Sequence, residues 1–209
     1  MRLRTLSAAA LTAAAALALA ACGADADTST GTGPATDRAT TEQDATDEVA
    51  ADAHNAADTE FAQMMIVHHE GAIEMAELAV ATAASAEVRA LGERIAAAQG
   101  PEIATMSGWL EAWGEDLPAE ADMSGMGHEG MQMEGMDQEA AMAELSGLTG
   151  AEFDRRFLEL MIEHHRGAIV MAEQERGEGE NAEAVRLAGA IIDDQTAEIT
   201  EMTNLRNAL

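Results

Sequence analysis

The 209-residue chain has 39 acidic and 11 basic side chains, giving a formal net charge of −28 at pH 7. A chain this acidic repels nucleic acid and anionic lipid head groups and attracts cations. The single cysteine excludes an internal disulfide and any zinc site built from several thiolates. We therefore expect a metal cation, and no nucleic acid, among its partners.

The N-terminus has the pattern of a bacterial export signal. Arg2 and Arg4 precede an apolar run over residues 6–21, which is too short for a stable membrane span. The run ends in Leu-Ala-Ala-Cys-Gly, which resembles the bacterial lipobox with Cys22 as the lipidated residue. The pattern predicts a signal peptide over residues 1–21 and a lipid anchor that holds the protein to the membrane surface, at the outer face of the cytoplasmic membrane. An ordinary signal-peptidase site with an incidental cysteine is the alternative.

The next segment is unlike a folded domain. Residues 23–57 are rich in Thr, Asp, Ala and Gly and show no hydrophobic periodicity. Such a sequence cannot bury enough apolar surface to fold, so we expect residues 22–57 to be a flexible tether that begins at the lipidated cysteine. Residues 58–209 remain, which is enough chain for one domain with one core.

An internal duplication organises this domain. Residues 61–77 read FAQMMIVHHEGAIEMAE, and residues 157–173 read FLELMIEHHRGAIVMAE without a gap. Each copy has two apolar-periodic segments separated by a short break, with expected helices over 58–84, 86–114, 150–177 and 182–208. Each copy therefore predicts one αα-hairpin, over residues 58–114 and 150–208.

The ends of these helices carry recognisable signals. Ser85 and Asn181 are the expected N-caps of the second helix in each hairpin. Thr149 and Glu152 have the spacing of a capping box, and Gly177 and Gly179 mark the expected stop of the third helix. The predicted fold class is all-α: a ferritin-like four-helix bundle made of two repeated hairpins. The connector over residues 115–148 is expected to be a loop that is mobile when empty.

Both histidines of each pair fall on the buried arc of a helical wheel. If each hairpin turns at its N-cap, His69 lies level with Glu102, and His165 lies level with Glu198. The same register places two methionine pairs side by side: Met65 with Met106, and Met161 with Met202. A buried carboxylate needs a partner, which histidine or a metal ion would supply. A purely structural polar network is the alternative.

The residue types favour copper as the metal. Where di-iron bundles place a glutamate three residues before a histidine, this chain has Met65 and Met161. Thioether is a poor ligand for iron and a good one for Cu(I), while imidazole suits Cu(I) and Cu(II). Zinc bound to histidine and glutamate is the alternative, but it would leave the methionines unused.

The connector adds a second group of candidate ligands. Five methionines and one histidine lie close together in this acidic segment: Met123, Met126, His128, Met131, Met133 and Met136. A solvent-exposed loop has no packing need for methionine, so we interpret the segment as a capture site for Cu(I). Low-complexity drift is the alternative.

The doubled motif Met-x-x-His-His-x-x-Ala-Ile-x-Met-Ala resembles a bacterial domain-of-unknown-function family, number three hundred and five. The resemblance covers residues 58–209. Members of that family are commonly exported, ferritin-like helical proteins, and some are implicated in copper binding and tolerance. The resemblance implies the same fold and carries copper binding to eight positions: Met65, His68, His69, Met75, Met161, His164, His165 and Met171.

The sequence thus predicts a non-enzymatic, extracytoplasmic lipoprotein that sequesters or delivers copper. An envelope copper-handling protein is the expected partner. One alternative is a ferritin-like metal-dependent oxidase, for which only Glu102 and Glu198 are well placed as bridging carboxylates. Another is a metal-free helical module that binds an envelope protein. The sequence contains no nucleophile–base set and no phosphate-binding glycine motif.

Overall fold

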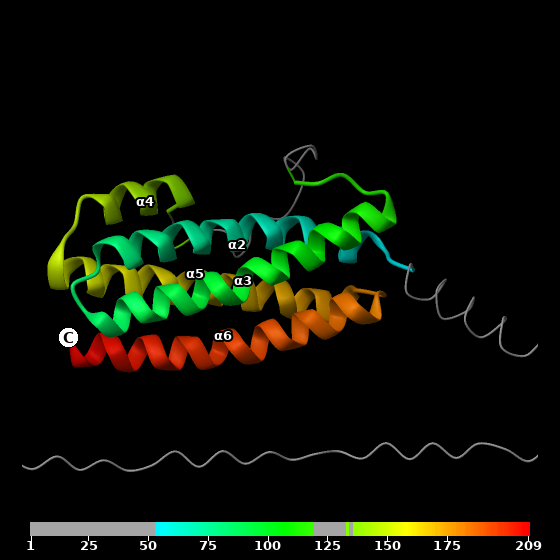
Figure 1. Cartoon of the computed structure of the whole chain (residues 1–209). Coiled ribbons are helices and arrows are strands. Elements are labelled where there is room, and N and C mark those ends of the chain that lie inside the picture. The colour runs from blue at the N-terminus through cyan, green and yellow to red at the C-terminus, as the bar shows by residue number, and fades with distance from the viewer. Residues whose placement is uncertain (1–52, 119–132, 134–135) are drawn as a thin grey trace, which may run out of the picture. The chain divides into compact units, whose positions relative to one another are not determined.

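The computed structural model describes residues 53–118, 133 and 136–209, and these residues fold into helices (Figure 1). The bundle contains four long helices, α2 (Ala56–Thr82), α3 (Ala86–Trp113), α5 (Gly150–Glu178) and α6 (Ala182–Ala208). A short helix, α4 (Gln138–Ser146), precedes α5. No helix in this part of the chain combines the length and apolar character needed to cross a lipid bilayer. The predicted signal peptide, the predicted lipidation site at Cys22 and the predicted tether up to residue 52 lie outside the described residues.

The all-α bundle of two repeated hairpins is confirmed, and each long helix begins and ends within two residues of its predicted bounds. The side chains of Ser85 and Asn181 cap α3 and α6 as predicted, and Gly179 is the C-cap of α5. The predicted capping box at Thr149 is wrong, because its side chain makes no capping hydrogen bond. The next residue, Gly150, has a left-handed φ of 65°, whereas a capping box needs a right-handed first turn.

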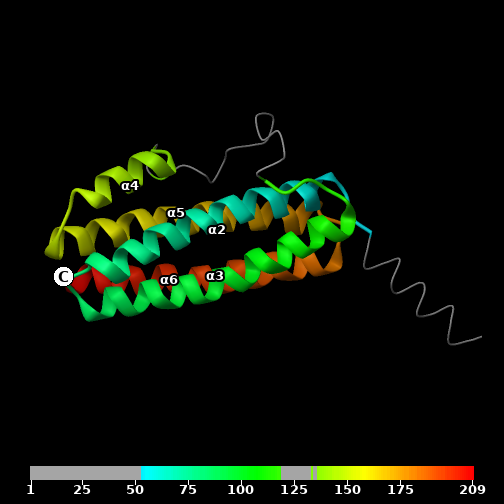
Figure 2. The same cartoon turned by 45° about the horizontal axis from the view of Figure 1, so that its top comes forward.

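The two hairpins are related by an approximate two-fold axis that runs across the bundle. Asp154, near the start of α5, accepts hydrogen bonds from the backbone N–H groups of Ala84 and Ser85, at 2.8 and 2.7 Å. Asp58, in the first turn of α2, accepts equivalent bonds from Glu180 and Asn181, at 3.1 and 2.9 Å. The start of each first helix therefore meets the turn of the other hairpin. Consequently α2 and α5 lie side by side and antiparallel (Figures 1 and 2).

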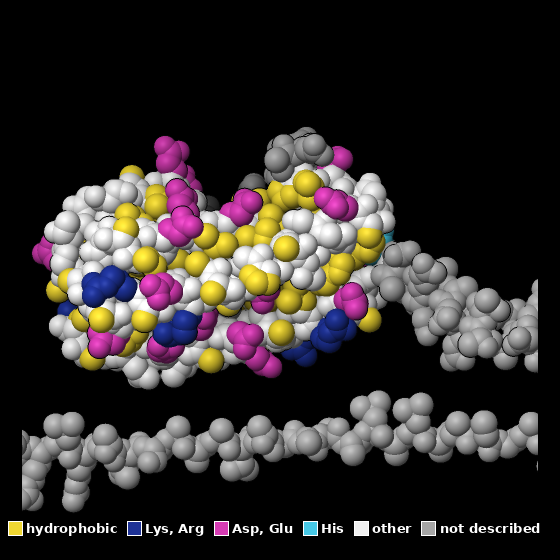
Figure 3. Space-filling model, in the orientation of Figure 1, with side chains coloured by type: hydrophobic (Ala, Val, Ile, Leu, Met, Phe, Trp, Pro, Cys, Tyr) yellow, Lys and Arg dark blue, Asp and Glu magenta, His cyan; other side chains and the backbone are white. Residues whose placement is uncertain are grey.

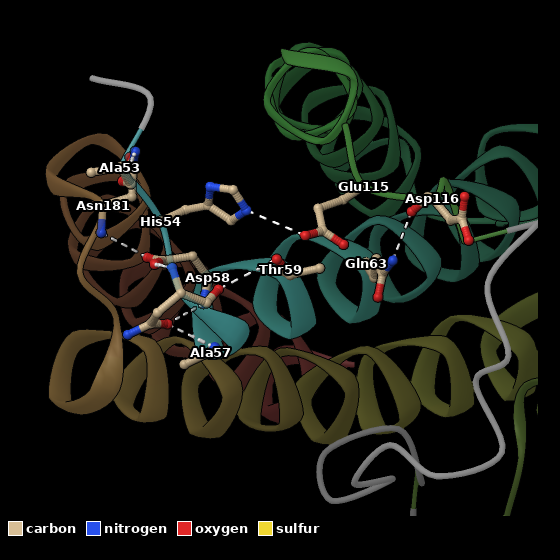
Figure 4. A network of polar contacts seen from close by, with 10 residues as sticks. Ala53, His54, Ala57, Asp58, Thr59, Gln63, Glu115, Asp116 and Asn181 are labelled. Carbon is tan, nitrogen blue, oxygen red and sulfur yellow. Dashed lines mark hydrogen bonds and ion pairs between the residues drawn. The ribbon is translucent and has the colours of Figure 1, made fainter. Parts of the chain in front are cut away.

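The last residues of the predicted tether are part of the fold. The side-chain amide of Asn181 donates to the carbonyl of Ala53, at 3.0 Å. The ring of His54 stacks on Trp113, with ring centres 4.5 Å apart. Its Nε2 lies 3.3 Å from Oε1 of Glu115, as Figure 4 shows. Residues 53–57 therefore belong to the bundle, which corrects the predicted boundary of the flexible tether.

The connector also differs from the predicted loop. Asp137 caps α4 through the N–H of Ala140, and Ala141 and Leu145 bury one face of this helix. Met133 is 1% exposed and belongs to the core, with Met136 packed beside it. The prediction of a wholly mobile connector is therefore wrong for residues 136–148. The reason is that residues 138–146 combine good helix formers with an apolar pair one turn apart.

The core consists of two apolar clusters. One contains the aromatic pair Phe153 and Phe157, and the other contains Phe61. Neither cluster includes the histidines of the repeated motif, although all four are buried. On the face of the molecule in Figure 3, acidic side chains are spread between patches of hydrophobic surface. The fold thus buries the four histidines of the repeated motif inside a largely apolar interior.

Candidate metal centre

The histidine pairs lie near the middle of α2 and α5, on the faces that these helices turn toward each other. Their exposed fractions are 2% for His68, 4% for His164 and zero for both His69 and His165. The burial that the helical wheel predicts is therefore confirmed. Because α2 and α5 are antiparallel, the two pairs are at the same level of the bundle.

His68 and His164 meet at the interface between the two hairpins. Their ring centres are 3.7 Å apart and the ring planes are inclined by 45°. Each ring is 6.5 Å from that of the neighbouring histidine in its own pair. The centre therefore consists of two imidazoles in contact across the two-fold axis, with one further imidazole behind each of them.

The two outer histidines bind glutamates of their own hairpins. His69 Nε2 lies 2.7 Å from Glu102 Oε2, and His165 Nε2 lies 2.7 Å from Glu198 Oε2. These are the two contacts that the hairpin register predicts. The glutamate side chains are 21% and 22% exposed, so each carboxylate is held between its histidine and solvent.

These contacts determine which ring nitrogen carries the proton. A carboxylate only accepts hydrogen bonds, so Nε2–H of His69 and His165 must be the donor. In a neutral ring the other nitrogen, Nδ1, then has a free lone pair. The Nδ1 atoms of His69, His164 and His165 are buried and have no hydrogen-bond partner among the described residues. A buried acceptor without a partner is costly, and a metal ion would satisfy it.

His164 is held in its neutral form. Burial lowers its pKa well below the ordinary value of 6.5, and the nearby rings of His68, His165 and His69 lower the pKa further. A hydrogen bond with the backbone of His68 acts in the opposite direction but is the smallest of these effects. Neutral imidazole is the form that binds metal ions.

The methionines of the motif are divided between the two core clusters. Met75, Met161 and Met202 belong to one cluster, and Met65, Met106 and Met171 belong to the other. All six are buried, and each cluster contains thioethers from both hairpins. The register prediction that Met65 accompanies Met106, and Met161 accompanies Met202, agrees with this division.

Two buried glutamines were missed at the sequence level. Gln99 and Gln195 are 3% and 4% exposed and occupy equivalent positions in the two copies. Both amide atoms of Gln99 and Oε1 of Gln195 have no hydrogen-bond partner among the described residues. Both lie one helical turn before the glutamates that bind His69 and His165. The duplicated sequence could have indicated them, because both copies keep a glutamine at this position of an apolar helix face, where polar side chains are unusual.

The connector residues can be placed only in part. Met123, Met126, His128 and Met131 lie outside the described residues. Met133 and Met136 are paired by two backbone hydrogen bonds of 2.9 and 2.8 Å and pack against the core. Packing therefore explains part of the methionine content of the connector, contrary to the view that a loop has no need for it.

The site offers nitrogen and sulfur ligands rather than a cage of oxygens. Within the described residues, no three His, Cys, Asp or Glu side chains converge into a ready-made metal site. Two imidazoles in contact are ligands that a soft or borderline ion such as copper accepts and that Mg²⁺ or Ca²⁺ does not prefer, and the same helices also carry buried methionines.

Comparison with known proteins gives one family. The family described as Domain of unknown function (DUF305) matches residues 58–206. A DUF305 protein from Streptomyces coelicolor, provisionally described as secreted, has 36% identity and a TM-score of 0.59, and the match covers 71% of this chain and 89% of that one. A DUF305 fragment from Deinococcus radiodurans has 32% identity and a TM-score of 0.65, covering 74% and 98%. No curated protein matches the chain.

A third solved relative binds metal. CopM in its Cu(I)-bound form has 33% identity and a TM-score of 0.59, and the match covers 72% of this chain and 96% of CopM. The same protein is also solved in Cu(II)-bound and silver-bound forms. Copper binding therefore occurs among relatives that share this fold.

Proposed function

The chain belongs to the DUF305 family, and from that premise we propose that it is an exported, lipid-anchored protein that binds copper and sequesters or delivers it, without catalysing a reaction. The observation that carries the proposal is the contact between His68 and His164, whose ring centres are 3.7 Å apart inside the bundle. Each hairpin supplies one imidazole to this contact. A core selected for stability alone would place apolar side chains there.

The surrounding residues support copper in both oxidation states. The unpartnered Nδ1 of His164 is available to an ion, and the Nδ1 atoms of His69 and His165 are oriented by glutamates in the manner of metal-bound histidines. The buried methionines above and below this level provide thioethers for Cu(I). Oxidation to Cu(II) would shift the preference toward histidine and glutamate. The copper-bound structures of CopM support the same assignment.

Loss of the central pair is the test of this proposal. The double variant His68→Gln/His164→Gln keeps polar side chains of similar size but removes both imidazoles. We expect at least a tenfold loss of copper affinity, measured by competition with a chelator of known affinity, while circular dichroism shows the helical fold retained. His54→Gln, which removes a histidine at the end of the bundle, is the matched control and should bind copper as the wild type does. Unchanged affinity in the double variant would contradict the proposal.

The role of the connector is tested separately. We propose that Met123, Met126, His128 and Met131 capture Cu(I) and pass it to the bundle, an interpretation that rests on composition. Substitution of these four residues by serine removes the candidate ligands and keeps the length of the connector. Copper bound per molecule, measured by elemental analysis after exposure to mixed metals, should fall in this variant while the histidine-dependent fraction remains.

Export and anchoring are proposed from the N-terminal sequence. The run that ends at Cys22 predicts cleavage before this residue and acylation of its thiol. Labelling of cells with an alkyne-tagged fatty acid should mark the wild-type protein and leave Cys22→Ser unmarked. Lipidation is supported if the Cys22→Ser variant stays unlabelled and accumulates in membranes with its signal peptide uncleaved. An unlabelled wild-type protein would contradict it.

A further inference from the structure

A pocket leads from the surface of the bundle to the central histidines. Its volume is about 370 Å³, and His68 and His164 are both among the residues that line it. The remaining lining residues come from α2 and from the start of α4: Val67, Glu70, Gly71, Glu74 and Gln138. The two histidines are otherwise almost completely buried. An ion in solvent can therefore approach them through this pocket.

Two carboxylates stand at the mouth of the pocket. Glu70 and Glu74 are exposed and lie one turn apart on the same face of α2. Gln138 Nε2 donates to Glu74 Oε2 at 3.2 Å and to the carbonyl of Gly71 at 2.9 Å. The amide therefore holds the Glu74 carboxylate beside the opening. A negative, partly enclosed opening raises the local concentration of cations.

The position of the Gln138 side chain over α2 depends on Gly71, two residues after His69. A Cβ atom at Gly71 would lie 2.9 Å from Oε1 of Gln138, which is closer than real side chains tolerate. The Gly that follows the His-His pair in the motif thus leaves room for Gln138 over the α2 backbone. The rim of the pocket is therefore formed jointly by the motif and by the end of the connector.

The duplication shows that these carboxylates are not a general feature of the repeat. In the second copy, Arg166 occupies the position of Glu70, and Val170 occupies the position of Glu74. Arg166 forms an ion pair with Glu163, and Val170 is 48% exposed. The histidines are thus present in both copies, while the acidic mouth is present only on the α2 side. Because Glu163, at the position of Val67, neutralises Arg166, the second copy has no net negative charge at these positions, and a cation is attracted more strongly to the α2 side.

We propose that this pocket is the route by which a copper ion reaches the His68–His164 pair, with Glu70 and Glu74 as transient outer ligands and Gln138 as the residue that positions Glu74. The inference rests on the proposed copper-binding function. The inner end of the route is suited to receive the ion, because His164 is 96% buried, lines the pocket, and has an Nδ1 without a hydrogen-bond partner among the described residues. A transient role requires that the acids change the rate of uptake and not the amount of copper bound.

The test is the rate of Cu(II) uptake by the full mature protein, followed in a stopped-flow instrument by quenching of Trp109 and Trp113 fluorescence at low salt. We expect Glu70→Gln/Glu74→Gln to slow association about 10-fold. The control Glu77→Gln/Glu93→Gln removes the same charge from exposed positions of α2 and α3 outside the pocket and should change the rate less than twofold. Glu70→Arg, which copies the second hairpin, should slow uptake more than Glu70→Gln does.

The possible results separate the route from the copper site itself. A wild type that takes up no copper would overturn the proposed function. Normal copper stoichiometry with equally slow uptake in the pocket and control variants would overturn the route alone, since net charge would then explain the effect. A reduced stoichiometry in the pocket variant would also overturn it, because the acids would then be equilibrium ligands.

Gln138 is tested through its partner. Gln138→Ala should slow uptake in the wild-type background and have no effect on the rate in a Glu74→Gln background. A structural defect in α4 would instead slow uptake equally in both backgrounds, and that result would overturn the positioning role.

Discussion

Asp58 and Glu175 bury two carboxyl groups at the end of the bundle where α2 begins and α5 ends, with exposed fractions of 0 and 1%. Burial raises the pKa of Asp58, but hydrogen bonds from the backbone of Asn55 and Asn181, from the Glu175 side chain and from the backbone of Glu180 outweigh it, so that the pKa is lowered overall. Glu175 has no such donors among the described residues. Burial and the neighbouring Asp58 raise the pKa of Glu175 to about 8. At neutral pH the pair therefore carries one charge, on Asp58.

The raised pKa of Glu175 predicts that the protein is less stable in alkaline solution. The folded protein holds a proton on Glu175 up to about pH 8, whereas the unfolded chain releases it near the ordinary value of 4.5. The folded state thus binds more protons, and the free energy of unfolding decreases as pH rises from about 4.5 through 8. The slope from this one group is at most about 1.4 kcal/mol per pH unit. Urea unfolding between pH 5 and 9 measures it.

Replacing the carboxyl group should remove this dependence. Glu175→Gln stays neutral at every pH and can still donate a hydrogen bond, so its free energy of unfolding should decrease much less between pH 5 and 9. The control Glu173→Gln changes an exposed glutamate on the same helix and should keep the wild-type slope. A slope that is equal in wild type and Glu175→Gln would mean that another group is responsible.

The glutamates behind the outer histidines should tune copper affinity. Glu102→Gln and Glu198→Gln replace a carboxylate, which only accepts hydrogen bonds, by an amide, which can also donate them. The proton of His69 and His165 is then no longer held on Nε2. Loss of such an orienting partner typically costs 10- to 100-fold in metal affinity. Calorimetric titration with copper measures the effect, and Glu111→Gln, an exposed site on α3, is the control. Wild-type affinity in both variants would show that these Nδ1 atoms do not bind the ion.

The close packing of α2 against α3 depends on Gly92. A Cβ atom there would lie 2.8 Å from the backbone carbonyl oxygen of Ala76, which cannot swing away as a side chain can. Gly92→Ala should therefore lower the free energy of unfolding by about 1–3 kcal/mol. Gly189→Ala, within α6 and with no atom within 4 Å of its added Cβ, should raise it by about 0.5–1 kcal/mol. Thermal or urea unfolding distinguishes the two, and a stabilised Gly92→Ala would show that the helices can separate at little cost.

The His–Glu contacts could be predicted because they depend on local geometry alone. An α-helix rises 1.5 Å per residue, so two helices joined by a short turn bring residues at equal distances from the turn to the same level. His69 and Glu102 are 16 and 17 positions from Ser85, and the observed contact follows. The proposal of copper as the metal did not follow from helix geometry. It depends on which metals imidazole and thioether groups bind, and on the copper-bound structures of related proteins.

The relative direction of the hairpins was not predictable from the sequence. The apolar faces of α2 and α5 show which sides meet, but a connector that spans residues 115–148 allows either direction. The direction becomes evident only from Asp58 and Asp154, each of which binds the turn of the other hairpin. The short helix α4 escaped prediction because its nine residues offer only two buried positions, Ala141 and Leu145.

The most direct measurement is a crystal structure of the copper-loaded protein with anomalous diffraction recorded at the copper edge. We predict an anomalous peak beside the rings of His68 and His164, within bonding distance of imidazole nitrogen. Copper found only on the connector or the surface, with the two rings still in contact at 3.7 Å, would contradict the assignment of the central pair as the copper site.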